Sequence, residues 1–320
     1  LPPVSGRWEQ YDDREAWLAA RRSIIGSSDV SAICGVGYAG SNVASVVASK
    51  ISDTPEKISK AKQKMFELGR LNERHILSLC AHVREIEITP IDDAIAFHPA
   101  IPYLGASLDG VAIDDGQPVV VEAKSVGFAM RHEWAGDEPP IKHHVQMLHQ
   151  LECTGWDRGL LAGWLGDEVK IFEVARDEEF LANLKTVVRS VWERYVLPRK
   201  LPPLDGSDGS LEAVRRMWPK DCGTVAEMGE DEQEIFEEYR RLGEEIKKLE
   251  SKRNCAKAML LSAVKESSYG VFPSGAAFSA KIVKRKGHYV EPSESRVFRA
   301  LDRLPKGAEM AQFMKGSIDE

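Results

Sequence analysis

Residues 117–125 read QPVVVEAKS, and this stretch decides the fold. The valines at 119–121 form an apolar run, which predicts a central strand covered on both faces of a sheet. Because side chains two positions apart share one face of a strand, Glu122 and Lys124 project together. Ala123 then points into the core. An apolar strand therefore ends in two charged groups on a single face.

Short strands and helices surround this stretch, so we expect an α/β fold with a mixed sheet flanked by helices. The other expected strands lie at 84–90, in a pair within 101–113, and in a hairpin of residues 159–166 and 169–175. The expected helices lie at 12–20, 27–33, 42–50, 56–84, 141–153, 177–196 and 229–267, and a strand or hairpin follows Gly270. In the first helix Trp17 and Leu18 should face inward, and the apolar positions of the fourth are Phe66, Leu68, Leu71, Ile76, Leu77 and Leu79.

The composition is that of an ordinary globular protein, with 43% hydrophobic and 29% charged residues in a chain of 320. No stretch approaches the ~20 apolar residues of a transmembrane helix, and the first ten residues lack the apolar run of a signal peptide. The five cysteines are scattered, which favours neither a disulfide framework nor a zinc ribbon. We therefore expect a cytoplasmic protein with no membrane partner.

The formal net charge of −7 argues against a nucleic-acid partner, which favours basic surfaces. Residues 229–250 hold nine acids and four bases, however, so the remainder of the chain carries only −2. A net charge of only −2 outside residues 229–250 is compatible with a local basic channel.

A boundary between two parts of the chain is predicted at 198–209, where PRKLPPLDGSDG is rich in Pro, Gly and Asp. We expect a core over 1–204 and a C-terminal extension over 205–320. The long acidic helix in the extension carries mixed acids and bases, which indicate a face exposed to solvent.

Four side chains from separate segments carry the chemistry. Asp109 ends one expected strand in SLDG, and Glu122 and Lys124 follow on the next, with Glu73 upstream. Charges on apolar strands are costly unless they bind something. Carboxylates are the ligands that Mg²⁺ prefers, and a lysine beside them can orient or deprotonate a water, so the set fits metal-assisted phosphodiester hydrolysis. The alternative for Glu122 and Lys124 alone is a structural ion pair at a strand end.

Five segments in order, RRSIIGSSDVSAICG, GRLNE, ASLDG, VEAKS and HHVQMLHQLECTG, resemble the lambda-exonuclease or YqaJ-like viral recombinase family of the PD-(D/E)XK nuclease superfamily. The resemblance covers residues 14–197. It implies a PD-(D/E)XK nuclease core, a mixed central sheet flanked by helices, with a helical C-terminal extension. It also implies a phage- or prophage-encoded enzyme that acts in the cytoplasm of a bacterial host.

The resemblance assigns a role to each site residue. Mg²⁺, for which Mn²⁺ could substitute, would be held by Asp109, Glu122, the backbone carbonyl of Ala123 and, through water, Glu73. Lys124 would act on the nucleophilic water. Gln146 would hydrogen-bond the carboxylate region or the scissile phosphate.

A 5′-phosphate pocket is also implied by the resemblance, which assigns it to Arg21, Ser28 and Ser107. A guanidinium matches phosphate in a bidentate way, and hydroxyls near a helix N-terminus supply further donors. The alternative for Arg21 is a solvated arginine at a helix end. Asp29 is better suited to capping a helix than to catalysis.

The function implied is a Mg²⁺-dependent 5′-to-3′ exonuclease that acts on double-stranded DNA ends and leaves 3′ single-stranded tails. In the family such enzymes form rings, often trimers, and pass the tail to a phage single-strand annealing protein for recombination. The alternatives are an exonuclease of other polarity, an endonuclease of the same superfamily, and a non-catalytic module that binds DNA ends.

Several other side chains have a structural and a functional interpretation. His143, His144 and His149 lie on one expected helix but not on one face, which favours solvated or DNA-facing histidines over a zinc site. Trp134 could stack on a base or anchor its loop. Four lysines, Lys57, Lys60, Lys62 and Lys64, could contact backbone phosphates or form a wet helix face.

Overall fold

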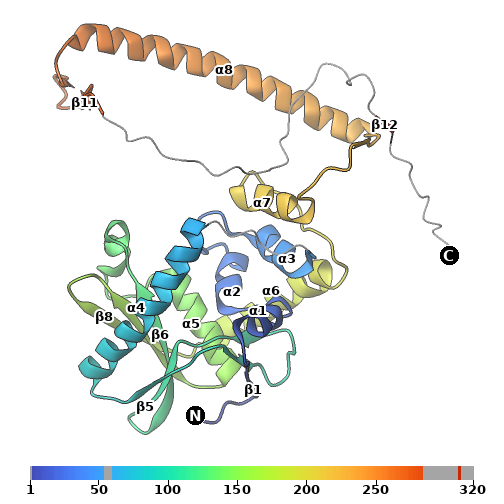
Figure 1. Cartoon of the computed structure of the whole chain (residues 1–320), viewed down its shortest axis with the longest axis vertical. Helices are drawn as coiled ribbons and strands as arrows, with labels where there is room; N and C mark the ends of the chain where they lie inside the picture. Colours follow the sequence, from blue (N-terminus) through green and yellow to red (C-terminus); the bar gives the residue numbers. More distant parts are fainter. Residues whose placement is uncertain (1, 54–59, 284–308, 311–320) are drawn as a thin grey trace. The chain divides into compact units, whose positions relative to one another are not determined.

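The structure is a computed structural model that describes residues 2–53, 60–283 and 309–310 (Figure 1). It divides into two compact units, Leu1–Trp218 and Pro219–Glu320. The first unit contains every residue that the sequence predicts for the site. The two units are described separately.

The centre of the first unit is a five-stranded sheet with the order β2-β5-β6-β7-β8. Its strands are β2 (Ile88–Pro90), β5 (Gly110–Asp114), β6 (Gln117–Ser125), β7 (Arg158–Trp164) and β8 (Val169–Ala175). The β6 and β7 strands run parallel and the other neighbours antiparallel. The sheet is therefore mixed, and β6 lies in its middle, as the apolar run in QPVVVEAKS predicts.

A smaller sheet has the order β1-β3-β4, formed by β1 (Arg7–Gln10), β3 (Ala94–Phe97) and β4 (Gly105–Ala106). The β1 and β3 strands are absent from the sequence prediction. Each has only four residues, and β3 reads AIAF with all four buried, so neither has the alternation that marks a half-buried strand.

Six helices in the described part of the first unit agree with predicted segments, and a seventh was not predicted. The six are α1 (Arg14–Arg22), α2 (Ser27–Ile33), α3 (Val43–Ile51), α4 (Lys60–Arg84), α5 (Ile141–Thr154) and α6 (Glu178–Val191), which the short turn η2 (Trp192–Val196) follows. The helix α7 (Asp208–Met217) and the short turn η1 (Phe128–Trp134) are absent from the sequence prediction. The predicted helical residues 56–59 lie outside the described residues. The Oδ1 of Asp13 accepts a hydrogen bond from the Ala16 N–H, so Asp13 caps the N-terminus of α1.

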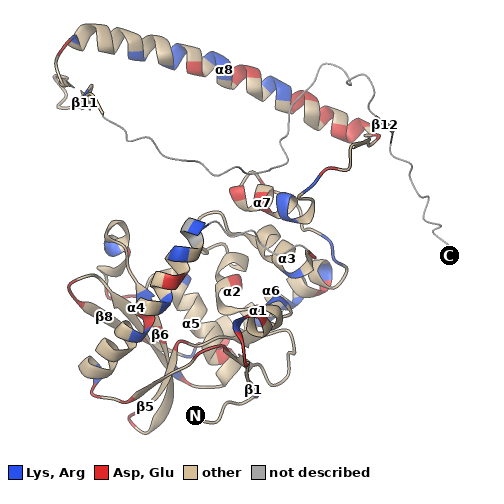
Figure 2. Cartoon of the chain, in the orientation of Figure 1, with Lys and Arg blue, Asp and Glu red and all other residues tan. Residues whose placement is uncertain are grey.

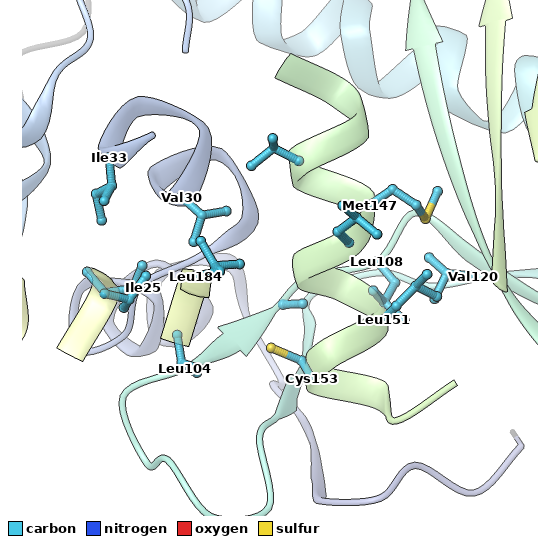
Figure 3. Close-up of a cluster of buried hydrophobic side chains, with 14 of the residues drawn as sticks. Ile25, Val30, Ile33, Leu104, Leu108, Val120, Met147, Leu151, Cys153 and Leu184 are labelled. Carbon is cyan, nitrogen blue, oxygen red and sulfur yellow. The ribbon is translucent and has the colours of Figure 1, made fainter. Parts of the chain in front are cut away.

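The two faces of β6 are covered by different helices. Val119 and Val121 share a buried cluster with Ile76 and Leu77 of α4. Val120 belongs to the cluster on the opposite face, to which α5 contributes Met147 and Leu151 (Figure 3). Since Glu122 and Lys124 follow Val120 at alternate positions, they project on the α5 side of the sheet. Ala123 is buried on the α4 side, as predicted.

Two predicted orientations are wrong. Leu18 is 48% exposed, because adjacent helical residues point about 100° apart and Trp17 takes the inward position. In α4, Leu68 and Leu71 are exposed while Ile76 and Leu77 are buried. Only the second half of this helix packs on the sheet.

The first unit extends beyond the boundary predicted at residue 204. Helix α7 packs on α3, where Ala213 shares a buried cluster with Ala44 and Ala48. The side-chain amide of Asn42 donates to Ser207 Oγ at 2.8 Å and to Ser210 Oγ at 3.0 Å. These contacts hold the Pro-rich segment and α7 in the first unit, which ends at Trp218.

The second unit contains one long helix, α8 (Glu230–Val264), which agrees with the predicted helix at 229–267. The predicted hairpin follows as β10 (Tyr269–Val271) and β11 (Ala277–Ser279), and β9 (Thr224–Val225) pairs with β12 (Glu309–Met310). In the described parts of the chain, none of the helices combines the length and the apolar character needed to cross a membrane.

Candidate active site

A cavity of about 810 Å³ opens between α1, α2, α4, α5 and the sheet. We call it the site cavity. Every side chain that the sequence predicts for the site lines it: Arg21, Ser28, Glu73, Ser107, Asp109, Glu122, Lys124 and Gln146. Residues up to 125 positions apart in the sequence therefore face one space.

The strongest contacts in the cavity are made by the carboxylate of Glu122. The Nζ of Lys124 donates a hydrogen bond to Glu122 Oε1 and forms an ion pair with it. The side-chain amide of Gln150 donates to Glu122 Oε2 at 2.7 Å. Burial alone would raise the pKa of Glu122, but the ammonium of Lys124 and the hydrogen bond from Gln150 together outweigh it and lower the pKa below its ordinary value. Glu122 is thus held as a carboxylate.

Asp109 is positioned by the strand beside it. It directly precedes β5, and its Oδ2 accepts a hydrogen bond from the backbone N–H of Ala123 at 2.8 Å. Burial and the neighbouring carboxylate of Glu122 raise the pKa of Asp109 well above its ordinary value. Two acids from adjacent strands therefore meet at the floor of the cavity.

Glu73 brings a third carboxyl group from the opposite side, from α4. Burial and the charge of Glu122 raise its pKa to about 7. Carboxyl groups that share a site oppose one another's ionisation, and a bound cation relieves this repulsion.

The donor chemistry of these three acids fits a hard divalent cation such as Mg²⁺, which takes carboxylate oxygens and waters. In the parts of the chain that the structure describes, no three His, Cys, Asp or Glu side chains form a ready-made metal cluster. Protein donors engage Asp109 and Glu122 instead, namely the Ala123 N–H, Lys124 and Gln150.

Gln146 lines the cavity, but its hydrogen bond differs from the predicted one. Its Oε1 lies 3.2 Å from Nδ1 of His143, and the contact to a carboxylate is made by Gln150 instead. Residues four apart share a helix face, so both glutamines of α5 point toward the cavity. The sequence prediction missed Gln150, although its spacing from Gln146 would have identified it.

Arg21 of α1 also lines the cavity. Its guanidinium lies over the ring of Trp17, with Cζ 4.5 Å from the ring centroid. Lys50 of α3 joins α1 to α2. Its Nζ donates to the Arg21 carbonyl of α1 at 3.1 Å and pairs with Asp29 of α2 at 2.7 Å. Asp29 Oδ2 also accepts from the Gly26 N–H at 2.8 Å, so it caps α2 as predicted.

Two hydroxyl side chains also line the cavity. Ser28 is exposed in the first turn of α2. Ser107 Oγ is buried, and it has no hydrogen-bond partner among the described residues. An unsatisfied buried hydroxyl costs about 1–3 kcal/mol, so a ligand oxygen at this position would remove a penalty.

Two of the three histidines of α5 differ from the solvated or DNA-facing set that the sequence predicts, whereas His144 is partly exposed. His143 and His149 are buried. His149 Nδ1 lies 3.2 Å from Ser27 Oγ and its Nε2 lies 3.7 Å from Cys153 Sγ. Burial lowers the pKa of His149 to about 4, which keeps the ring neutral. His149 therefore connects α5 to the start of α2.

Trp134 anchors its loop. The ring is buried, with centroids 5.7 Å from Phe172 and 5.6 Å from His143. It packs on Gly163 of β7, where a Cβ atom would lie 2.2 Å from Trp134 Cζ3. Glycine at this position allows the ring to contact the strand.

The four lysines before Glu73 are only partly described. Lys57 and the side chain of Lys62 lie outside the described residues, and Lys60 and Lys64 are exposed on α4.

Comparison with known proteins finds a family model and a relative that are similar to this chain. Residues 16–157 match the family model described as the YqaJ-like viral recombinase domain. The chain is also 24% identical over 261 residues to the uncharacterized protein YqaJ of Bacillus subtilis strain 168, which covers 80% of each chain.

Solved structures that are similar to this chain include two of one enzyme. One is an alkaline exonuclease, LHK-Exo, from Laribacter hongkongensis, with 23% identity, a TM-score of 0.46 and coverage of 56% of this chain and 91% of that one. The other is LHK-Exo in complex with dAMP, with 20% identity, a TM-score of 0.48 and coverage of 63% and 96%. The matched segment of the family model contains Arg21, Asp109, Glu122 and Lys124. The family model therefore confirms, over residues 16–157, the resemblance to YqaJ-like viral recombinases that the sequence segments indicate.

Proposed function

We propose that the chain is a Mg²⁺-dependent 5′-to-3′ exonuclease that degrades one strand of double-stranded DNA from its end. It leaves 3′ single-stranded tails for single-strand-annealing recombination of the phage type. One observation carries this proposal. A single cavity brings Glu73, Asp109, Glu122 and Lys124 together with Arg21 and with the hydroxyl of Ser107, which has no hydrogen-bond partner among the described residues. The alkaline exonuclease among the similar structures is consistent with it.

At the acidic end, Asp109, Glu122 and the carbonyl of Ala123 would hold the ion, with Glu73 acting through water. Bound Mg²⁺ supplies charge that stabilises the developing negative charge on the phosphate. Lys124, held by its ion pair with Glu122, orients the attacking water and adds a second positive charge. Gln150 fixes the orientation of the Glu122 carboxylate.

In the same cavity, Arg21, Ser28 and Ser107 bind the 5′-terminal phosphate. A guanidinium held against Trp17 loses little freedom when it pairs with an anion. The hydroxyl of Ser107 gains the partner that it lacks among the described residues. This pocket selects an end rather than an internal site, and so distinguishes an exonuclease from an endonuclease.

A homo-oligomeric ring, with a trimer favoured, and a single-strand annealing protein complete the proposal. A ring reconciles the net charge of −7 with a DNA substrate, because acidic residues outside leave the inner channel to supply positive potential.

The test is digestion of linear duplex DNA in Mg²⁺ or EDTA, with strand-specific labels and either 5′-phosphate or 5′-hydroxyl ends. We expect Mg²⁺-dependent loss of the phosphorylated strand from its 5′ end, and Mn²⁺ should substitute. Loss from the 3′ end would indicate the opposite polarity, and cutting of closed circles an endonuclease. Tight binding of duplex ends without digestion would indicate a non-catalytic module.

A further inference from the structure

Helix α8 carries large apolar side chains at a regular spacing. Ile235, Tyr239, Leu242, Ile246 and Leu249 follow one another at intervals of four, three, four and three residues. This is the spacing of the a and d positions of a coiled coil. In this register Ile246 occupies an a position, and Leu242 and Leu249 occupy d positions.

The same register continues to the end of the helix. Its next positions are Arg253, Ala256, Leu260 and Ala263. We call Ile235, Leu242, Ile246, Leu249 and Leu260 the apolar stripe. These five side chains lie on one side of a helix of 35 residues.

None of the described parts of the chain buries the apolar stripe. The exposed fractions are 69% for Ile235, 44% for Leu242, 57% for Ile246, 64% for Leu249 and 39% for Leu260, and α8 has no buried residue among those described. A helix that packs on nothing is marginal in water, because most helical stability in proteins comes from burying an apolar face. We therefore expect another apolar surface to pack on the stripe.

The charges of α8 identify that surface. Residues 230–245 hold eight acids and two bases, a net charge of −6. Residues 246–264 hold five bases and one acid, a net charge of +4. Figure 2 shows the acidic residues gathered where α8 begins. A helix with the same composition and the opposite direction complements both halves at once.

The flanking positions of the register favour the same orientation. In a parallel pair, position g of one helix lies beside position e of the other. Glu245 would then face Glu250, and Lys252 would face Lys257, in both copies. Two like-charged contacts on each side disfavour a parallel arrangement.

An antiparallel pair also matches the sizes of the side chains. With the helices centred between residues 247 and 248, Ile246 lies opposite Leu249 of the second copy and Ile235 lies opposite Leu260. Tyr239 lies opposite the small Ala256, and Arg253 can extend its methylene groups over Leu242. We propose that α8 pairs with α8 of a second copy of this chain as an antiparallel coiled coil.

The first experiment measures the mass of the full-length chain in solution by sedimentation equilibrium. The Leu249→Glu variant places a charge in the apolar stripe, and Leu261→Glu makes the same change at an exposed leucine outside it. We expect Leu249→Glu to halve the mass and Leu261→Glu to leave it unchanged. Halving is expected whether residues 1–218 are single or form a ring, since the coiled coil joins two such assemblies.

Circular dichroism accompanies this measurement. Leu249 is exposed, so the variant should retain its fold apart from any fraying of α8 on dissociation. An unchanged mass in a folded Leu249→Glu variant would overturn the proposal. It would assign the stripe to another occupant, such as residues 284–320 of the same chain.

The second experiment determines the orientation. Spin labels are placed at Gln233→Cys or Ser262→Cys, both outside the stripe, after serine replaces the exposed Cys34, Cys222 and Cys255. At 1.5 Å per residue, an antiparallel pair separates two labels at 233 by about 40 Å and brings labels at 233 and 262 side by side. Labels at 233 that lie next to each other would overturn the antiparallel arrangement.

Discussion

The side-chain amide of Gln150 lies 2.7 Å from Oε2 of Glu122, and Lys124 engages the other oxygen of the same carboxylate. The carboxylate is thereby fixed from two elements, α5 and β6. Both contacts are directed at the group that would hold the metal ion, so the orientation of Glu122 depends on a helix remote in sequence from its strand.

Gln150→Ala should lower kcat for duplex digestion by about 10- to 100-fold, because a hydrogen bond to a charged group contributes about 1.5–3 kcal/mol. DNA binding, measured by gel shift, should change little. Gln146→Ala is the matched control, since it removes a cavity-lining amide of the same helix that bonds to His143 instead. Equal losses in both variants would show that Gln150 has no special relation to Glu122.

Lys124→Ala should reduce digestion by more than about 100-fold while duplex binding persists, because it removes a charge needed in the transition state. Single-turnover digestion and fluorescence anisotropy measure the two properties separately. Turnover within tenfold of the unaltered chain would refute the assigned role.

Arg21→Ala should lower the preference for 5′-phosphorylated over 5′-hydroxyl ends by about tenfold, the effect of one charge-assisted hydrogen bond of about 1.5 kcal/mol. The ratio of initial rates on the two substrates measures this. Arg22→Ala is the control, because Arg22 is adjacent and exposed. A similar loss of rate on both kinds of end in the Arg21 variant would assign Arg21 to another task.

Glu152 predicts a dependence of stability on pH. It lies 3.0 Å from His98 and 2.7 Å from Lys185, and it pairs with Arg176. Burial alone would raise its pKa, but these partners lower the pKa to about 2, from an ordinary value of 4.5. Because the folded pKa is the lower one, the stabilisation is complete above pH 4.5 and is lost as the pH falls toward 2.

Glu152→Gln should therefore destabilise the fold by about 3 kcal/mol at pH 7, since it leaves buried cations without their partner. In urea unfolding, the difference between the two chains should shrink below pH 4.5. A difference that stays constant down to pH 3 would show that Glu152 is not the group responsible.

Gly163→Ala should destabilise the first unit by about 1–3 kcal/mol, because the added Cβ would meet the ring of Trp134 at 2.2 Å. Gly127→Ala is the control, since a Cβ there meets nothing within 4 Å. Thermal unfolding measures both. A stable Gly163→Ala variant would mean that the Trp134 loop adapts without cost.

Much of the fold could be predicted because local pattern and tertiary structure agree there. The apolar run in QPVVVEAKS requires cover on both faces, and β6 has it from α4 and α5. The period of two along this strand also placed Glu122 and Lys124 on one face. The position of Asp109 at the end of one expected strand, before Glu122 and Lys124 on the next, indicated that these three side chains lie together. The placement of Arg21, Ser28 and Ser107 with them came from the family resemblance.

Other features depend on tertiary packing, which local patterns do not contain. The β3 strand is four buried residues whose partner β1 lies more than 80 positions earlier, so neither strand could be recognised alone. The burial of His143 and His149 depends on what packs against α5. Gln150 and the apolar stripe of α8 are different, since their spacings are present in the sequence and were obscured by the neighbouring histidines and charges.

The hydrogen bond from the Ala123 N–H to Asp109 has a consequence for how the site can be dissected. The paired backbone of β5 and β6 ends at Gly110 and Val121, and beyond it the Asp109 side chain takes the acceptor role that a strand carbonyl would otherwise fill. The carboxylate of Asp109 thus both belongs to the proposed metal site and holds the end of β6 in place. Truncation to alanine loosens the hairpin as it removes an acid, whereas Asp109→Asn keeps an acceptor oxygen and changes the charge alone.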